Sequence, residues 1–190
     1  GLADLLYEKT HGNAFFLTQL LADLHESGAL YFNRNKRRWQ CDREKILATE
    51  ISGNVIDLMV KRIRNLPGSS QKAILQASCL GDRFRLSTLA RLLGEPPYIV
   101  ANYLEPALHE GVLRPIGSAY RYAQQKDNRS SVHYRFVHDR VRQAAYSLIA
   151  PEVREETHFR IAEIWLRGTQ DKDHEYSIFD IANQYNAGRR

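Results

Sequence analysis

The chain has 190 residues, of which 43% are hydrophobic and 26% charged, and its formal net charge is +5. This composition is typical of a globular protein and excludes an intrinsically disordered one. No apolar run approaches the roughly 20 residues that cross a bilayer, and no secretory signal pattern is present, so we expect neither a membrane span nor export. Cys41 and Cys79 have no metal-ligand spacing, which indicates a reduced, cytoplasmic setting.

The first predicted segment covers residues 1–52 and contains two helices, a hairpin and a short third helix. Leu2, Leu5 and Leu6 predict the end of one helix, and the pattern breaks at residues 10–13. A second helix ends near Gly28, residues 29–41 predict a hairpin, and residues 44–48 predict a short helix. The apolar stripe of the second helix consists of Phe16, Leu17, Leu20, Leu21 and Leu24.

A basic cluster lies at the turn of this hairpin, between Tyr31–Phe32 and Trp39. Its members are Arg34, Lys36, Arg37 and Arg38. Basic residues beside aromatic ones can bind nucleic acid. Because a single short cluster has a weak electrostatic footprint, we interpret residues 33–36 as a solvated turn.

The second predicted segment covers residues 53–150 and begins with short helices. Asn54 is expected to cap a helix that ends at Pro67–Gly68, and Ser69 or Ser70 to cap the next one. A third helix is predicted from Ser87 through Leu93, and Gly94 is expected to stop it.

The same segment continues with one more helix and three extended stretches. The helix begins at Pro97 and has Gly111 as its expected C-cap. The extended stretches are residues 112–116, 120–122 and 132–137, with a polar loop over residues 124–131. Three short helices followed by a hairpin with a long polar loop is the order of a winged helix.

A His-Asp pair stands where the last of these extended stretches gives way to a helix. Tyr134 and Phe136 share one strand parity, and the apolar residues after Asp139 then recur at helical spacing. Asp139 is therefore a candidate helix cap. His138 precedes a helix N-terminus, where N–H groups and the helix dipole favour an anion such as phosphate. A capped helix with a merely structural histidine remains the alternative.

Residues 151–190 predict two further helices, over residues 153–166 and 178–185. Such a pair is typical of the first unit of a tetratricopeptide-like helical repeat, which would contact protein partners. Together the three segments predict a mainly α protein with small β-hairpins.

Several motifs in this order resemble the lid and winged helix of signal-transduction ATPases with numerous domains (STAND), a branch of the AAA+ class. They are Thr10–Leu17, Asn54–Met59, Ala77–Phe84, Pro106–Gly111 and Phe136–Tyr146. The set covers nearly the whole chain. It is most similar to the ATPase modules of large hybrid kinases that join a serine/threonine-kinase-like region to a sensor histidine kinase.

The resemblance implies a nucleotide site shared with other domains. It assigns to His138 a contact with the β-phosphate of bound ADP that holds the resting state, and to Gly12, Asn13 and Ala14 a place near the base. Ala14 stands where the family usually has proline. ATP or ADP would be the ligand, with Mg²⁺ held mainly by an upstream phosphate-loop domain.

Catalytic signatures are absent from the sequence. No G-x-x-x-x-G-K-[S/T] occurs and no lysine follows a glycine, so we expect no ATP hydrolysis by this chain alone. We interpret the chain as a fragment of a longer ATPase or sensor kinase. His133 and His138 lie on opposite strand faces, and residues 171–175 (Asp-Lys-Asp-His-Glu) suit a solvated linker better than a metal site.

Three functional hypotheses follow. The first is a regulatory element that closes over nucleotide and relays its state to neighbouring signalling domains. The second is a DNA-binding winged helix, which the helix over residues 98–110 disfavours because it has no lysine or arginine and carries Glu105 and Glu110. The third is an adaptor that holds protein partners through its C-terminal helices.

Overall fold

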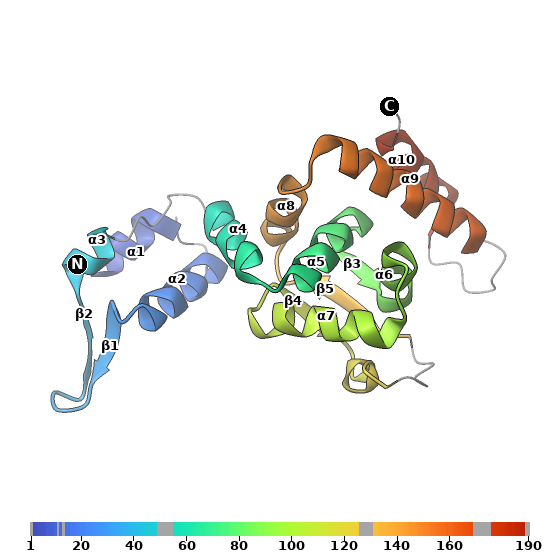
Figure 1. The fold of residues 1–190 in the computed structure, drawn as a ribbon. Coiled ribbons are helices and arrows are strands. Elements are labelled where there is room, and N and C mark those ends of the chain that lie inside the picture. The colour runs from blue at the N-terminus through green and yellow to red at the C-terminus, as the bar shows by residue number, and fades with distance from the viewer. Residues whose placement is uncertain are drawn as a thin grey trace. The chain divides into compact units, whose positions relative to one another are not determined.

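The computed structural model describes residues 2–10, 12, 14–48, 55–125, 131–168 and 176–188 (Figure 1). These residues form two compact units, Gly1–Leu58 and Met59–Arg190, and each is described here by itself. The protein is mainly helical with two small antiparallel sheets, so the predicted fold class is confirmed. Within the described ranges, no helix is both long and apolar enough to cross a membrane.

The first unit consists of helices α1 (Leu2–Thr10), α2 (Ala14–Glu26) and α3 (Arg43–Ala48), with a hairpin between the last two. Strands β1 (Leu30–Asn33) and β2 (Arg38–Cys41) pair antiparallel in that hairpin, as predicted. The left-handed backbone of Gly28, at φ +70°, allows α2 to end there.

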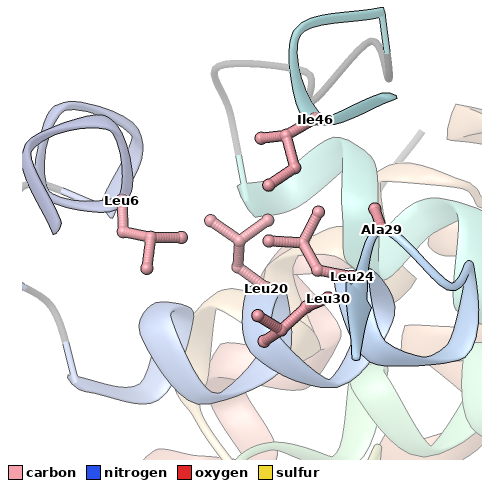
Figure 2. Close-up of a cluster of buried hydrophobic side chains, with 6 residues drawn as sticks. All are labelled: Leu6, Leu20, Leu24, Ala29, Leu30 and Ile46. Atoms are coloured by element: carbon pink, nitrogen blue, oxygen red, sulfur yellow. The ribbon is translucent and has the colours of Figure 1, made fainter. Parts of the chain in front are cut away.

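A small apolar cluster holds this unit together. Figure 2 shows side chains from α1, α2, the hairpin and α3 pointing toward one another. Leu20 and Leu24 contribute because their spacing of four residues places them on one face of α2. The cluster consists of Leu6, Leu20, Leu24, Ala29, Leu30 and Ile46.

Helix α4 (Val55–Asn65) spans the division between the units, and the second unit continues with a helix-and-strand core. In chain order its elements are α5 (Gly68–Leu80), β3 (Arg83–Arg85), α6 (Leu86–Leu93), α7 (Pro97–His109), β4 (Leu113–Ile116), a 3₁₀ turn η1 (Ala119–Tyr122), β5 (His133–Phe136) and α8 (Asp139–Ser147).

Strand β5 lies in the middle of the second sheet, whose order is β3-β5-β4 with antiparallel pairs. Phe84 is paired with Tyr134, and Leu113 with Phe136, so four large side chains share the buried face. The Phe84 ring centroid is 6.0 Å from that of Tyr134. This apolar packing fixes β5 against the helices, and with β5 the start of α8.

Helices α9 (Pro151–Gly168) and α10 (Ile178–Ala187) complete the second unit (Figure 1). Helix α9 packs against α5 and α6, and α10 packs against α9. The Arg160 guanidinium donates to the carbonyl of Leu92 at 2.7 Å, which ties α9 to the end of α6. Ser177 and Asp180 form a reciprocal capping box at the start of α10.

Several predicted helix ends differ from the structure. Helix α5 begins at Gly68 with Pro67 as N-cap, so neither Ser69 nor Ser70 is the cap. Pro67 is extended at ψ 147° and has a fixed φ, which places the helix start one residue after it. The expected Asn54 cap lies outside the described residues.

Two further predictions in the same region are corrected. Glu110, not Gly111, is the C-cap of α7, although Gly111 follows at φ +65°. Residues 120–122 belong to a 3₁₀ turn instead of a strand, since amides here bond three residues back, as Arg121 N–H does to the Ser118 carbonyl at 3.2 Å.

Candidate functional site at the start of α8

The junction between β5 and α8 positions His138. Main-chain amides hold the chain extended beyond the strand: Phe136 donates to the Asp82 carbonyl and Val137 to the Val112 carbonyl. His138 is the last extended residue, at φ −154° and ψ 148°, and α8 begins immediately after it. The imidazole is therefore presented at a helix N-terminus and is partly exposed.

One ring nitrogen of His138 caps the helix. The Arg140 amide donates to Nδ1 of His138 at 3.1 Å. The lone pair at Nδ1 must accept this bond, so the proton of the neutral ring resides on Nε2. The second nitrogen is consequently an N–H donor beside the first turn of a helix, where the main-chain dipoles favour negative charge.

Asp139 is not the cap, contrary to the sequence prediction. It is the first residue of α8, and its carboxylate accepts from Arg142 Nε at 3.0 Å and from Gln143 Nε2 at 2.5 Å. An acidic side chain in the first turn stabilises a helix through the dipole without bonding the first amides. The cap lies one residue earlier than predicted, because the strand hydrogen bonds end at Val137 and the imidazole of His138 already accepts from the Arg140 amide.

Arg142 connects this helix start to α5. Its Nη1 donates to the carbonyl of Ser78 at 3.4 Å while its Nε holds Asp139. Ser78 belongs to the last turn of α5, whose carbonyls favour a cation. One guanidinium thus bonds both the first residue of α8 and the last turn of α5, and the arrangement can orient an N–H donor toward an anion.

The other predicted nucleotide residues belong to the first unit. Gly12 is exposed with φ +75°, a backbone that an L-residue rarely adopts, and Ala14 is the exposed first residue of α2. Asn13 lies outside the described residues. These positions and His138 occupy different units, so each half of the predicted site is described separately.

The buried Cys79 thiol is a weak nucleophile at neutral pH. Burial raises the pKa of the Cys79 thiol to about 11, which keeps it protonated at neutral pH. No group of three or more His, Cys, Asp or Glu among the described residues could hold a metal ion. The acidic stretch at residues 171–175 lies outside those residues.

The helix expected to read DNA in a winged helix has an acidic environment instead. A groove beside the C-terminal half of α7 is lined by Asn65, Leu66, Pro67, Asn102, Glu105, Pro106, His109 and Glu110. Glu105 lies 3.9 Å from Nε2 of His109, and both are exposed. Carboxylates at this surface repel phosphate, which disfavours docking of α7 on a duplex.

Sequence reasoning missed a chain of hydrogen bonds that ties α8 to the C-terminal helices. It joins the Tyr146 hydroxyl, both ring nitrogens of His158, the Gln184 amide and the Cys79 carbonyl. The available signal was the helical spacing of His158 with Ile161, Ala162 and Trp165, which places the imidazole on the buried face of α9.

Comparisons with known proteins relate the chain to signalling kinases. It is 26% identical to hybrid signal transduction histidine kinase G of Dictyostelium discoideum, over 98% of this chain and 7% of that protein. It is 24% identical to peroxide stress-activated histidine kinase mak3 of Schizosaccharomyces pombe, over 96% of this chain and 7% of that protein. The chain thus spans about 7% of the length of these curated relatives. No family model and no solved structure matches it.

Proposed function

We propose that this chain is the regulatory part of a nucleotide-switch ATPase module in a multidomain signalling kinase. In this proposal residues 53–150 act as a winged helix that closes over ADP or ATP bound by an upstream phosphate-loop domain. The nucleotide biases a two-state element, and neighbouring signalling domains respond to that state. Sequence similarity to two histidine kinases over nearly the whole chain supports the signalling context.

The hydrogen bond from the Arg140 amide to Nδ1 of His138 carries the proposal. Because Nδ1 accepts this bond, the neutral ring has its proton on Nε2. An N–H group at a helix N-terminus is a suitable donor to a β-phosphate oxygen. The hydrogen-bonded strand before His138 and the Arg142 bonds after it would hold the imidazole in position before nucleotide binds. Binding would then cost little conformational entropy at this residue.

The order of elements in the second unit supports the winged-helix part of the proposal. Helix α5, strand β3, helices α6 and α7, and strands β4 and β5 follow one another, with β5 central in the sheet. Gly12, Asn13 and Ala14 would approach the base from the lid. Mg²⁺ would be held mainly by residues of the phosphate-loop domain.

The test is ADP binding by the longer protein that joins this chain to its phosphate-loop domain. The informative variant is His138→Asn, because an asparagine oxygen can still cap α8 while the imidazole N–H is lost. We expect ADP affinity to fall by about tenfold or more, as for the loss of one hydrogen bond to a charged group, and resting kinase activity to rise.

The matched control is His109→Asn, an exposed histidine on α7. It should leave ADP affinity within about twofold of the unsubstituted protein. If His138→Asn bound ADP as tightly as this control, the assigned phosphate contact would be wrong.

The same samples separate the DNA-binding alternative. DNA binding is measured by the fluorescence anisotropy of a labelled random-sequence duplex at low salt. We expect no salt-sensitive binding of the protein to this duplex. Salt-sensitive binding that His138→Asn left intact would favour a transcriptional role over a nucleotide switch.

A further inference from the structure

The β1–β2 hairpin presents a cationic turn on an ordered ribbon. Arg34, Lys36, Arg37 and Arg38 are all exposed, and no acidic residue occurs between Ser27 and Cys41. The side chain of Asn33 fixes both sides of the turn: its Oδ1 accepts from the Lys36 amide at 3.0 Å and its Nδ2 donates to Gln40 at 2.6 Å. The four charges are therefore held close together by the backbone.

Three aromatic side chains lie just behind this turn and remain open to solvent. Tyr31 is 44% exposed, Phe32 47% and Trp39 57%. Phe32 and Trp39 are direct cross-strand partners with ring centroids 5.6 Å apart, and Trp39 also meets His25 of α2 edge to face at 5.7 Å. Because neighbouring rings already restrict Trp39, its side chain would lose little conformational entropy when a partner covers it.

We propose that this hairpin, residues 30–41, docks an extended acidic segment of a partner protein. The turn supplies complementary charge, and exposed tryptophan, tyrosine and arginine are the residues that dominate protein interfaces. Within the described residues the sheet has only two strands, so the outer edge of each can accept a further strand. The inference stands independently of the nucleotide switch.

Two other anionic partners fit the hairpin less well. For a bilayer, the cations lie at the tip and the aromatic rings behind it, so insertion would carry the charges into hydrocarbon first. For nucleic acid, four cations at one narrow turn reach few phosphates, and the number of phosphate contacts sets such affinity.

The test uses the whole chain and a fluorescent random copolymer of glutamate and tyrosine at physiological salt. We expect saturable binding that the triple variant Arg34→Gln, Lys36→Gln, Arg38→Gln weakens at least about tenfold. The triple variant Lys61→Gln, Arg64→Gln, Arg114→Gln removes the same charge from exposed positions elsewhere and should bind within about twofold of the original chain. Equal binding by the two triple variants would overturn the proposal.

A second measurement tests whether the aromatic side chains of the hairpin contact the partner. Trp165 is only 7% exposed, so acrylamide quenching of tryptophan fluorescence reports mainly on Trp39. The copolymer should protect Trp39 from quenching, and polyglutamate without tyrosine should protect it less. Unchanged quenching at saturation would contradict the proposal, as would tighter binding of oligothymidylate or phosphatidylserine vesicles than of the copolymer.

Discussion

The hydroxyl of Tyr146 lies 2.9 Å from Nε2 of His158, and the direction of this hydrogen bond follows from its neighbours. Gln184 Nε2 donates to the Cys79 carbonyl at 3.2 Å, which turns Gln184 Oε1 toward Nδ1 of His158 at 2.6 Å. Nδ1 must therefore donate, and in the neutral ring Nε2 accepts from Tyr146. One buried imidazole thus joins α8, α9, α10 and α5.

A cation reinforces the α8 end of this chain of bonds. The Arg154 guanidinium lies 4.6 Å from the centre of the Tyr146 ring and donates from Nη2 to the Ser147 carbonyl at 3.1 Å. Because Tyr146 belongs to the helix that His138 caps, a displacement of α8 would disturb the same bonds that hold α9 and α10. In the proposed nucleotide switch, these contacts would carry a movement of α8 to the C-terminal helices.

Tyr146→Phe should destabilise the second unit. The substitution leaves Nε2 of His158, which is 8% exposed, without its donor, and an unsatisfied buried polar atom costs about 1–3 kcal/mol. Denaturant unfolding followed by circular dichroism measures the change. Tyr185→Phe is the control, since Glu163, which accepts its hydroxyl, is 35% exposed and can be hydrated. Equal losses from both variants would show that His158 does not depend on Tyr146.

Alkaline pH should weaken the fold through Cys79. Burial raises its thiol pKa from 9.0 to about 11, so the folded state disfavours the thiolate. The contribution of the neutral Cys79 thiol to the unfolding free energy is fully present below pH 9. It is lost as pH rises to about 11, by roughly 2–3 kcal/mol in total.

The pH profile of Cys79→Ala provides the check. Between pH 9 and 10 its unfolding free energy should fall less steeply than that of the original chain. Above pH 10, Tyr134 contributes a further loss in both proteins, because burial raises its pKa to about 12. Parallel profiles below pH 10 would mean that Cys79 does not titrate as described.

The two thiols should differ in reactivity. Cys41 is exposed on β2, whereas Cys79 is 4% exposed and has a raised pKa. With iodoacetamide at pH 8, we expect one rapid addition, at Cys41, and a second only after denaturation, because the thiolate is the reacting species. Peptide mapping by mass spectrometry identifies the modified residue, and rapid labelling of Cys79 would contradict the packing of α5.

Gly188→Ala should loosen α10 from α9. A Cβ at Gly188 would lie 2.7 Å from the Phe159 nitrogen and 2.9 Å from the Glu155 carbonyl oxygen, both main-chain atoms that cannot rotate away. We expect a loss of about 1–3 kcal/mol, as for overpacking of a close contact. Gly68→Ala, which meets no atom within 4 Å, is the control in the same denaturation assay. A stable Gly188→Ala chain would show that the helices do not approach this closely.

Local patterns predicted most of the elements but not all of them, since β3 was missed and residues 120–122 form a 3₁₀ turn, and some helix ends also differ. The alternation of Tyr134 and Phe136 predicted a strand, which the structure confirms, and both side chains lie on its buried face. The cap of α8 was predicted one residue late, because the long-range bonds from Phe136 to Asp82 and from Val137 to Val112 end at Val137 and leave His138 as the last extended residue. No local preference contains that information.

The candidate site, too, was predicted only in part from the sequence. His138 was singled out from the sequence because it stands between an extended run and a helix. Which of its nitrogens bears the proton depends on the Arg140 amide, and so on the start of the helix. Its predicted phosphate contact stays a prediction, as do the roles of Gly12, Asn13 and Ala14.

The sequence by itself determined a mainly α protein, a hairpin with a basic turn, and the absence of a phosphate loop. These properties depend on periodicity, turn residues and short motifs, which act over a few residues. Only the tertiary structure decided that β5 is central in its sheet and that Tyr146, His158, Gln184 and Cys79 meet. Gln184 and Cys79 are 105 residues apart, and packing of whole helices, not local preference, brings such residues together.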